Sequence, residues 1–454
     1  MQELRDRSMK SFRPFLALLL CLTNLSAQLV EHPMSNLYKK TLFERLLLVQ
    51  QIANLNDQER DFLERSATTW ANHMIENSIG TMPLPMGIVP YFIINDKEYL
   101  IPMVTEEPSV IAAASHGAKQ ARHSGGFTCS MSEQIMIGQM QCMGTIDSEI
   151  INATTTALRE HKQDLLALAN QCHPNLVQRG GGAVDLQPHF IETIRRQMLI
   201  IHLTVNVQDA MGANIVNTML EALAPHIEQL IPFQCAVKII SNLSTSRMAK
   251  ASALWKKELL GEAVIEKILD MDAWALADPY RCATHNKGIM NGIDAVALAT
   301  GNDCRAIEAG AHAFAACQKN GGAKTGYAPL TRYSLTPEGD LKGDIELPLS
   351  IGIVGGSIQS NPTVQLALKI IGTTSASELG CVMAAVGLAQ NFAALQALVT
   401  YGIQAGHMRL HSKNIALQAG VPENYVNAIA QKMCQEKRIT VQRAQELAQI
   451  HLNQ

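Results

Sequence analysis

The chain has 454 residues, of which 47% are hydrophobic and 17% charged, a composition that is typical of a globular protein and excludes an intrinsically disordered one. The formal net charge is −3 and no run of five lysines or arginines occurs, so the basic surface typical of nucleic-acid-binding proteins is absent. The ten cysteines include no Cys-x-x-Cys pair, which favours reduced thiols over a disulfide framework or a zinc site.

Residues 1–33 form an N-terminal extension with two interpretations. The apolar stretch from Phe15 to Leu25 follows Lys10 and Arg13, as in a signal peptide, but nearby acidic residues dilute the basic end. The stretch is also shorter than the ~20 residues that span a bilayer. We therefore favour an over-extended start with Met34 as the natural first residue, and expect a cytoplasmic protein without a membrane span, with secretion as the alternative.

The first half of the remaining chain predicts helices and strands in alternation. Short helices are expected over 36–75, followed by a β-hairpin over 88–104 and a helix from Pro108 to about Arg122. The next block is typical of a small α/β sandwich with a glycine loop at 180–182. Its expected strands are 135–145, 198–207 and 235–241, and its expected helices are 150–170 and 212–230.

The second half is mostly helical. Alanine-rich helices are expected over 262–330, followed by a hairpin over 333–355 that turns at 338–340. Ser375 and Glu378 have the spacing of a capping box and predict the start of a long helix. We expect a break in this helical run near Gly402 or Gly406, and an end at Gly420 and Pro422 before a last helical unit.

One candidate site for a dinucleotide follows the apolar strand at 198–207. The usual Gly-x-Gly-x-x-Gly motif is absent, and Asp209-Ala210-Met211-Gly212-Ala213-Asn214 stands between strand and helix instead. Gly212 would allow close approach to the backbone, and the helix N-terminus favours a pyrophosphate. The alternative is an ordinary helix cap in which Asp209 accepts hydrogen bonds from free amides.

Two further segments carry candidate acid and base groups. Glu106 and Glu107 are adjacent, and neighbouring carboxylates can deliver a proton near neutral pH, although a solvated acidic helix start has the same pattern. Lys287, followed by Gly288 and Gly292, could present an ammonium to an oxyanion from a loop, with Asp303 as its partner. A capped loop with an exposed lysine is the alternative.

His407 and His411 are four residues apart and can share one face of a helix. A two-histidine metal site would need a carboxylate that the surrounding sequence does not supply, so we expect no metal. A general-acid role for one histidine fits better, and an ordinary surface histidine is the alternative.

Together these motifs resemble the HMG-CoA reductases, and the match extends over about residues 36–450. The short catalytic tail and the lack of a membrane anchor make the chain similar to the bacterial, class II members of this family. The motifs that carry the resemblance, in family order, are Glu76-Asn77-Ser78-Ile79-Gly80, Glu106-Glu107-Pro108-Ser109, Asp209 to Asn214, Thr284 to Asp303, and Leu410-His411-Ser412-Lys413-Asn414-Ile415-Ala416.

The resemblance implies an oxidoreductase that converts HMG-CoA to mevalonate and CoA with two NAD(P)H, in the mevalonate pathway of isoprenoid synthesis. The implied site residues are listed by role: catalytic Glu107, Lys287, Asp303 and His411; substrate-binding Ser109, Arg281 and Asn291; cofactor-binding Asp209, Ala210, Met211, Gly212, Asn214 and His173. Lys287 would stabilise the oxyanion, His411 would protonate the CoA thiolate, Glu107 would protonate the alkoxide, and Asp303 would bridge Lys287 and Glu107.

The resemblance also bears on the cofactor and the assembly. NADH-using members carry an Asp soon after a Leu-Ala-Asn, whereas here Asn170 is followed by Gln171, Cys172 and His173, which favours NADPH with NADH as the alternative. A homodimer or a larger assembly of dimers is implied, because the family's active site lies between subunits near the Glu76–Gly80 motif.

The implied fold class is α+β with three parts after the extension. Residues 34–132 and 242–395 form a mostly helical CoA- and substrate-binding domain, 133–241 an inserted small α/β (ferredoxin-like) dinucleotide-binding domain, and 396–454 a mobile helical flap with His411. Two alternatives stay open: the same enzyme oxidising mevalonate with NAD and CoA in a catabolic route, or a non-catalytic CoA-binding or scaffold protein.

Overall fold

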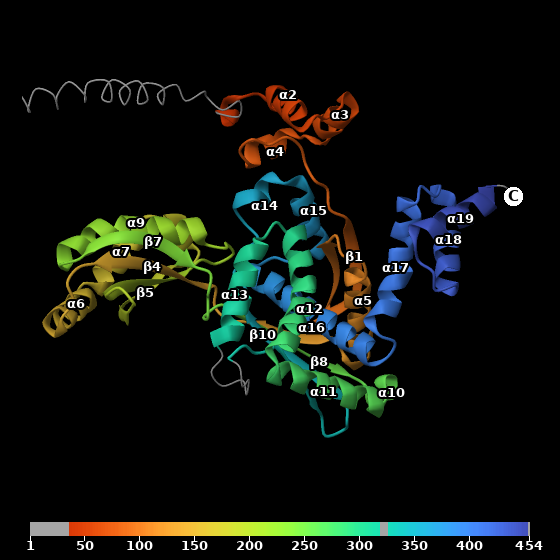
Figure 1. The fold of residues 1–454 in the computed structure, drawn as a ribbon. Helices are drawn as coiled ribbons and strands as arrows, with labels where there is room; N and C mark the ends of the chain where they lie inside the picture. The colour runs from red at the N-terminus through yellow and green to blue at the C-terminus, as the bar shows by residue number, and fades with distance from the viewer. Residues whose placement is uncertain (1–35, 318–325, 453–454) are drawn as a thin grey trace, which may run out of the picture. The chain divides into compact units, whose positions relative to one another are not determined.

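The computed structural model describes residues 36–317 and 326–452, with the side chains of 403–410 and 451–452 left out, and the extension before residue 36 lies outside this range (Figure 1). The chain divides into two compact units, Met1–Pro83 and Leu84–Gln454.

The first unit is helical, as predicted for 36–75. It contains η1 (Leu37–Lys39), α2 (Leu42–Ala53), α3 (Asp57–Ser66) and α4 (Thr69–Met74). Thr41 with Glu44, and Asn56 with Glu59, form reciprocal capping boxes that satisfy the first amides of α2 and α3. The motif at 76–80 follows α4 as an irregular segment, in which Ser78 is buried.

A six-stranded sheet organises the main core of the second unit. Its strand order is β2-β1-β3-β8-β10-β9, and only the β1–β3 pair is parallel. The expected hairpins are both present, with positive φ at Asn95 and Asp96 in the first turn and at Gly339 in the second. The strands are β1 (Met86–Ile94), β2 (Lys97–Val104), β3 (Phe127–Met131), β8 (Met248–Trp255), β9 (Thr331–Leu335) and β10 (Leu341–Pro348).

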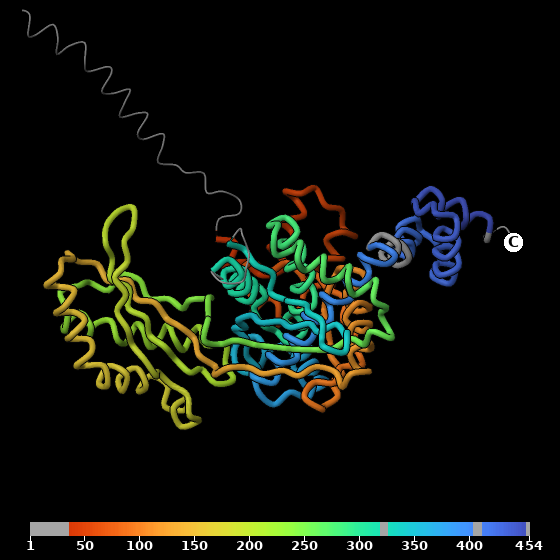
Figure 2. Tube along the Cα trace, turned by 90° about the horizontal axis from the view of Figure 1, so that it is seen from below, coloured from red at the N-terminus to blue at the C-terminus, as the bar shows by residue number. Residues whose placement is uncertain are grey.

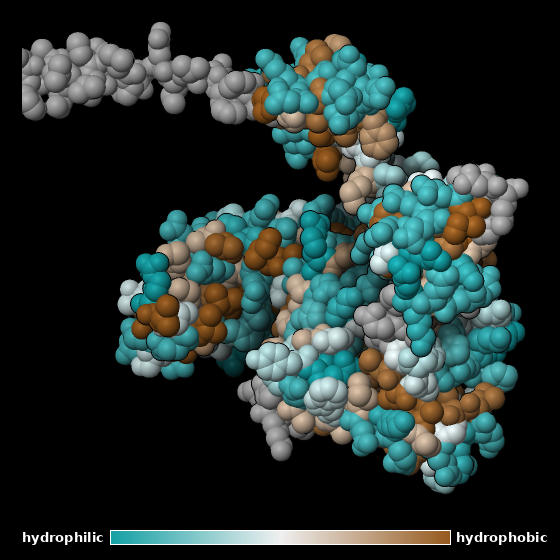
Figure 3. All heavy atoms as spheres, turned by 45° about the vertical axis from the view of Figure 1, so that its right-hand side comes forward, coloured by the Kyte–Doolittle hydropathy of each residue, from teal (hydrophilic) through white to brown (hydrophobic). Residues whose placement is uncertain are grey.

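Helix α16 (Ala376–Val399) is the centre of this core and is apolar on every side. Among the described residues it is the one helix long and apolar enough to cross a membrane, yet 72% of its apolar window is buried inside the protein. Phe392 stacks on Trp255 of β8 at 4.0 Å between ring centroids, which ties the helix to the sheet. On the face drawn in Figure 3, hydrophilic side chains predominate and apolar patches are interspersed.

The remaining helices of the main core pack around α16 and the sheet. Gly292 and Gly387 allow α12 and α16 to approach closely, because a Cβ on either would lie within 3.0 Å of the other helix. The helices are α5 (Val110–Ala121), η2 (Arg122–Ser124), α10 (Lys257–Leu260), α11 (Glu262–Ala277), α12 (Pro279–Ala299), α13 (Cys304–Cys317), α14 (Gly356–Ser360) and α15 (Pro362–Ile371).

A second, four-stranded antiparallel sheet has the order β5-β6-β4-β7 and its own apolar core. Two connecting segments, 132–134 and 242–247, join it to the main sheet (Figure 2). Its strands are β4 (Ile135–Met143), β5 (Gly182–Glu192), β6 (Gln197–Asn206) and β7 (Gln234–Ser241), and its helices are α6 (Ser148–Glu160), α7 (Lys162–Gln171), α8 (Pro174–Gln178) and α9 (Ala213–Leu230).

The tail forms three helices with a small core of their own: α17 (Ile403–Gln418), α18 (Glu423–Gln435) and α19 (Val441–Leu452). The predicted break is confirmed at Gly402, which has φ 79 directly before α17, and the predicted end at Gly420, which has φ 75. Positive φ at both positions is favourable for glycine and costly for other residues.

Several predicted element boundaries were wrong. Helix α5 begins at Val110, after Ser109 in a left-handed conformation with φ 77, rather than at Pro108. The helix expected over 150–170 is interrupted at His161. Glu378 does not complete a capping box, since it accepts from the backbone of Thr374 while Ser375 alone caps α16.

Three strands escaped sequence analysis: β3, β5 and β8. Strand β5 contains Pro188, which cannot donate to a ladder and so argues against a strand. Because β5 is at the edge of its sheet, Pro188 is tolerated there. Gly182, expected in a loop, begins this strand.

Candidate active site

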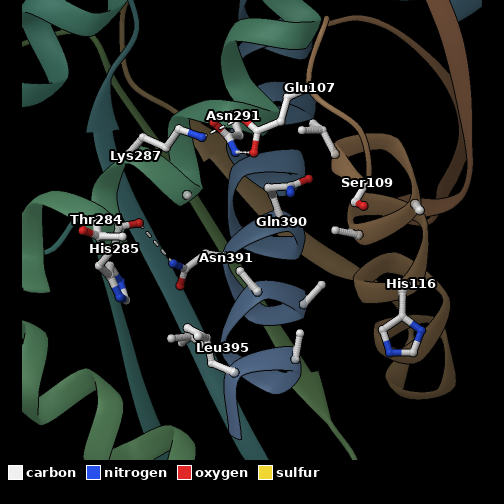
Figure 4. A pocket seen from close by; sticks show the side chains of 18 of the residues that line it. Glu107, Ser109, His116, Thr284, His285, Lys287, Asn291, Gln390, Asn391 and Leu395 are labelled. Carbon is white, nitrogen blue, oxygen red and sulfur yellow. Dashed lines mark hydrogen bonds and ion pairs between the residues drawn. The ribbon is translucent and has the colours of Figure 1, made fainter. Parts of the chain in front are cut away.

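A cavity of about 420 Å³ opens between α5, α12 and α16. Its lining includes five of the expected site residues, from segments that are far apart in the sequence: Glu107, Ser109, Arg281, Lys287 and Asn291. Figure 4 shows Lys287 and Glu107 pointing toward each other at its polar end, with Asn291 beside them.

The Lys287–Glu107 ion pair is the central contact of the cavity. Lys287 Nζ donates to Glu107 Oε2 at 2.6 Å, and Asn291 Nδ2 donates to Oε1 of the same carboxylate at 3.4 Å. The side chains of Lys287 and Glu107 are 59% and 34% exposed, so both can be reached by a ligand. The nearest charged partner of Glu107 is thus a cation rather than the adjacent Glu106.

Lys287 lies on a helix rather than in the loop expected from its glycines. Helix α12 runs from Pro279 to Ala299, and Lys287 and Asn291 are one turn apart on it. A Cβ on Gly288 would meet no atom within 4 Å, so this glycine leaves space beside Lys287. The sequence analysis therefore identified the residues but not their secondary structure.

Polar atoms without partners point to a polar ligand in the cavity. Within the described part of the chain, Ser109 Oγ, Arg281 Nε and Gln390 Oε1 are buried and have no hydrogen-bond partner. A buried polar atom left unpaired costs ~1–3 kcal/mol. A ligand with carboxylate and hydroxyl groups would satisfy these atoms.

Burial around Arg281 gives this residue a distinct electrostatic setting. Desolvation lowers the pKa of Arg281, and its guanidinium lies 5.9 Å from the centre of the Trp274 ring. No carboxylate pairs with it among the ion pairs of the described residues. A partly desolvated guanidinium without a paired carboxylate is suited to bind an anionic group of a ligand.

His285 lies in the wall of the same cavity but is held neutral. It is 1% exposed, and burial followed by repulsion from Arg281 and Arg332 lowers its pKa to about 3. Its Nε2 contacts Thr331 Oγ1 at 2.5 Å. His285 is therefore no proton donor near neutral pH.

Asp303 is separate from Lys287 and Glu107 in this chain. Its carboxylate pairs with Arg305 at 3.1 Å and accepts from the amide of Ala306. Burial acts to raise the pKa of Asp303, but the hydrogen bonds from Arg305 and Ala306 outweigh it and lower the pKa. Among the ion pairs of the described residues, Asp303 pairs with Arg305, whereas Lys287 pairs with Glu107, so Asp303 does not bridge Lys287 and Glu107 within this chain.

His411 lies on α17 and is exposed, outside the cavity lining among the described residues. Its neighbour Ser412 is buried in the tail's own core and contacts Cys434 at 3.3 Å between Oγ and Sγ. The side chain of His407 lies outside the described residues. Of the described residues, no group of three or more His, Cys, Asp or Glu is placed to hold a metal ion.

The segment Asp209–Asn214 connects β6 to α9 and differs from an ordinary helix cap. Asp209 Oδ1 accepts from the amide of Ala376 at the start of α16, and no side chain caps α9. Gly212 has φ 102, and a Cβ there would lie 2.6 Å from Val207, so the backbone conformation and the packing at this position both require glycine. The alternative in which Asp209 caps its own helix is wrong.

His173 is half-buried before α8, and its Nε2 has no partner in the part of the chain that the structure describes. Nearby, Asn170 both donates to and accepts from the backbone of Ala183 at the start of β5. Gly182, at the start of β5, pairs with Asn206 at the end of β6. The segment with Asn170 and His173 therefore lies near the same end of these strands as Asp209.

Sequence analysis missed part of the cavity. Gln390 and Asn391 interrupt the apolar run of α16, and this was the available signal. Apolar residues of the same helix also line the cavity, and their contribution has no sequence motif; they include Ala393, Ala394, Ala397 and Leu398.

Comparison with known proteins identifies the family. The model of the hydroxymethylglutaryl-coenzyme A reductase family matches residues 41–412. The 3-hydroxy-3-methylglutaryl-coenzyme A reductase of Archaeoglobus fulgidus is 47% identical over 90% of this chain and 92% of its own. A probable reductase of the same name from Borreliella burgdorferi is 36% identical over 84% of this chain and 86% of its own.

Solved structures of similar proteins also point to the HMG-CoA reductase family. A class II 3-hydroxy-3-methylglutaryl-CoA reductase from Streptococcus pneumoniae, bound to NADPH in open conformations, has a TM-score of 0.70 and 41% identity, covering 91% of this chain and all of its own. The mixed α/β fold, the order of the motifs and these matches agree. The chain therefore belongs to the HMG-CoA reductase family of oxidoreductases, and within it to class II.

Proposed function

We propose that the chain reduces HMG-CoA to mevalonate and CoA with two molecules of NADPH, as part of the mevalonate pathway. The observation that carries the proposal is the Lys287–Glu107 ion pair in a cavity whose buried Ser109, Arg281 and Gln390 have unpaired polar atoms. A substrate with a carboxylate, a hydroxyl and a thioester carbonyl supplies a partner for each kind of atom.

The lining of the cavity suggests how the substrate lies. Arg281 and Ser109 bind the carboxylate and hydroxyl end, while the thioester oxygen faces Lys287. The apolar residues of α16 beyond Gln390 then accommodate the first part of the CoA arm. Apolar walls with a few polar groups are typical of sites for ligands of this kind.

The chain's own residues supply charge stabilisation and protons. NADPH supplies a hydride to the carbonyl carbon in each half-reaction. Lys287 Nζ stabilises the oxygen as it becomes negative, first in the hemithioacetal and then in the alkoxide. His411 protonates the departing CoA thiolate, and Glu107, which can take a proton across its contact with Lys287, protonates the alkoxide.

The cofactor is assigned to one edge of the four-stranded sheet. The uncapped start of α9, with Asp209, Ala210, Met211, Gly212 and Asn214, binds the pyrophosphate. His173 lies at the same edge and carries no negative charge that would repel a 2′-phosphate, which favours NADPH over NADH. The Streptococcus pneumoniae relative was solved with NADPH.

Three functional parts follow from this assignment. Residues 34–132 and 242–395 bind CoA and substrate, the ferredoxin-like part 133–241 binds the dinucleotide, and 396–454 is a flap. The separate apolar cores of the two sheets and of the tail support this division. Because His411 is exposed outside the cavity, the flap must move to bring it to the thiolate.

A homodimer, or an assembly of dimers, completes the site. Within its own chain Asp303 pairs with Arg305 and not with Lys287 among the described ion pairs, so we assign the Asp303 that bridges Lys287 and Glu107 to a second copy. We place the protein in the cytoplasm, because the described cysteines are free thiols.

Steady-state assays test the reaction and its direction. Purified protein is expected to oxidise two NADPH per HMG-CoA and to release mevalonate and CoA, with a lower KM for NADPH than for NADH. Faster turnover of mevalonate, CoA and NAD than of HMG-CoA and NADPH would favour the catabolic direction. Absence of turnover with either nicotinamide cofactor would support the non-catalytic alternative.

Mixed dimers test the shared site. When Lys287→Ala and Asp303→Ala chains are co-expressed, each mixed dimer should contain one site with both residues intact, and activity should return relative to either variant alone. If both residues act within one chain, no mixed dimer has an intact site and activity stays at the level of the single variants.

A further inference from the structure

A fully buried arginine lies where the chain returns from the four-stranded sheet to the main sheet. Arg247 is 0% exposed and directly precedes β8. Burial lowers its pKa to about 9, and it stays charged near neutral pH. No carboxylate within 4.0 Å pairs with it among the described ion pairs, so hydrogen bonds must compensate for its burial.

The guanidinium donates mainly to backbone carbonyls. Nη2 donates to Ala210 O at 3.2 Å and to Ile351 O at 2.5 Å, and Nη1 donates to Met211 O at 3.3 Å. Nε donates to Gln134 Oε1 at 2.9 Å. Two of these acceptors belong to the segment assigned to the dinucleotide.

These contacts determine which way two peptide groups point. In a trans peptide the C=O and the following N–H point in opposite directions. Because Ala210 O and Met211 O face Arg247, the N–H groups of Met211 and Gly212 face away from it. Helix α9 begins directly after Gly212, and no side chain caps it.

A second segment, residues 351–354, also packs against this loop. Ile353 N donates to Asp209 O at 2.9 Å, and Ala210 and Val354 form a parallel bridge. Gly352 packs on the 210–211 peptide so closely that a Cβ would lie 2.6 Å from Met211 N. Since Arg247 also binds Ile351 O, it joins both segments.

We propose that Arg247 is a positioning residue for dinucleotide binding, which orients the Met211 and Gly212 amides toward the cofactor's diphosphate by holding the preceding carbonyls. The inference rests on the proposed function. Only a planar guanidinium can donate to three carbonyls and Gln134 at once, whereas lysine has a single nitrogen at one point.

The test compares ligand affinities of Arg247→Met, Arg247→Lys and Gly352→Ala with wild type. Ser350→Ala is the matched control, because it removes the buried Ser244–Ser350 contact of 2.9 Å next to Ile351 without touching the 209–212 loop. Dissociation constants are measured separately for NADPH, by fluorescence, and for HMG-CoA, by calorimetry. HMG-CoA binding also reports whether the main core has folded.

Arg247→Met should weaken NADPH binding on the order of 10- to 100-fold, as misplaced binding groups do, and change HMG-CoA binding less than about 3-fold. Arg247→Lys should recover part of the loss. Gly352→Ala, which keeps the arginine but displaces the peptide, should also weaken NADPH binding selectively. If Arg247→Met does not fold, the NADPH affinity of Gly352→Ala tests the proposal instead.

Equal losses for both ligands, or NADPH affinities like that of Ser350→Ala, would overturn the inference and show that Arg247 only stabilises the fold. Those results would leave the proposed function intact as long as wild type reduces HMG-CoA. A wild-type protein without turnover would instead contradict the proposed function itself.

Discussion

His285 and His411 occupy opposite situations in the molecule. His285 lies in the cavity wall beside Lys287, yet it is 1% exposed and its pKa is lowered to about 3. His411 lies on a separate helical tail, exposed and outside the cavity. A histidine in the cavity wall is thus unable to act as an acid near neutral pH, while the one proposed as the acid must be brought in. Proximity alone does not identify a general acid, because burial decides its protonation.

The largest expected effect tests the tail histidine. His411→Gln should reduce turnover of HMG-CoA by ~10²–10⁴, since it removes a general acid. Reduction of free mevaldehyde should be nearly unaffected, because that half-reaction expels no thiolate. Steady-state rates with both substrates measure the split.

His407→Gln is the control for His411, one helical turn away, and should be mild. If His411→Gln impaired thioester and aldehyde reduction equally, His411 would have to transfer a proton other than the one to the CoA thiolate. Equal sensitivity of the two histidines would favour a metal site on this helix.

The cavity wall provides the next test. Lys287→Ala should lower kcat by ~10²–10³ in both half-reactions, because both develop negative charge on the same oxygen. Lys342→Ala, which removes an exposed lysine paired with Asp344 on β10, is the control and should be near wild type. A Lys287→Ala variant that loses only thioester reduction would contradict the assignment to the oxyanion.

The pH dependence of stability tests the buried histidine. Its folded pKa is about 3 against an unfolded value near 6.5, so the unfolded chain binds the extra proton as pH falls below about 6.5. The stabilising contribution is complete above pH ~6.5 and is lost progressively toward pH ~3. From pH 7.5 to 5 this amounts to roughly 2 kcal/mol.

His285→Gln should therefore show a smaller decrease in unfolding free energy over this pH interval than wild type, measured by urea denaturation. The pH profile of kcat should keep the same acid limb in this variant. A changed acid limb would mean that His285, and not only His411, titrates during catalysis.

A third histidine gives the smallest effect. His173→Asp should shift the NADPH-to-NADH ratio of kcat/KM toward NADH by about tenfold, because a carboxylate repels a 2′-phosphate and accepts from a ribose hydroxyl. His173→Asn is the neutral control and should keep the preference. An unchanged ratio in His173→Asp would place the 2′-position elsewhere.

Sequence motifs singled out candidate site residues but did not predict their structural setting. Glu107 and Lys287 were identified from short motifs, and both line one cavity. Their contact joins residues 180 positions apart, and it depends on how α12 packs against the segment between β2 and α5, which no local pattern encodes. The helical state of the Lys287 segment was missed because two glycines argued for a loop, whereas Gly292 serves helix packing.

By itself the sequence determined the family, the candidate site residues and most helices and hairpins, because these depend on local motifs, spacing, capping and apolar periodicity. Only the tertiary structure decided what burial and packing control. It neutralised His285 by desolvation, paired Asp303 with Arg305, and turned Asp209 toward α16 instead of its own helix. The tertiary structure also explains why Pro188 is compatible with a strand, because the order of the sheet makes β5 an edge strand.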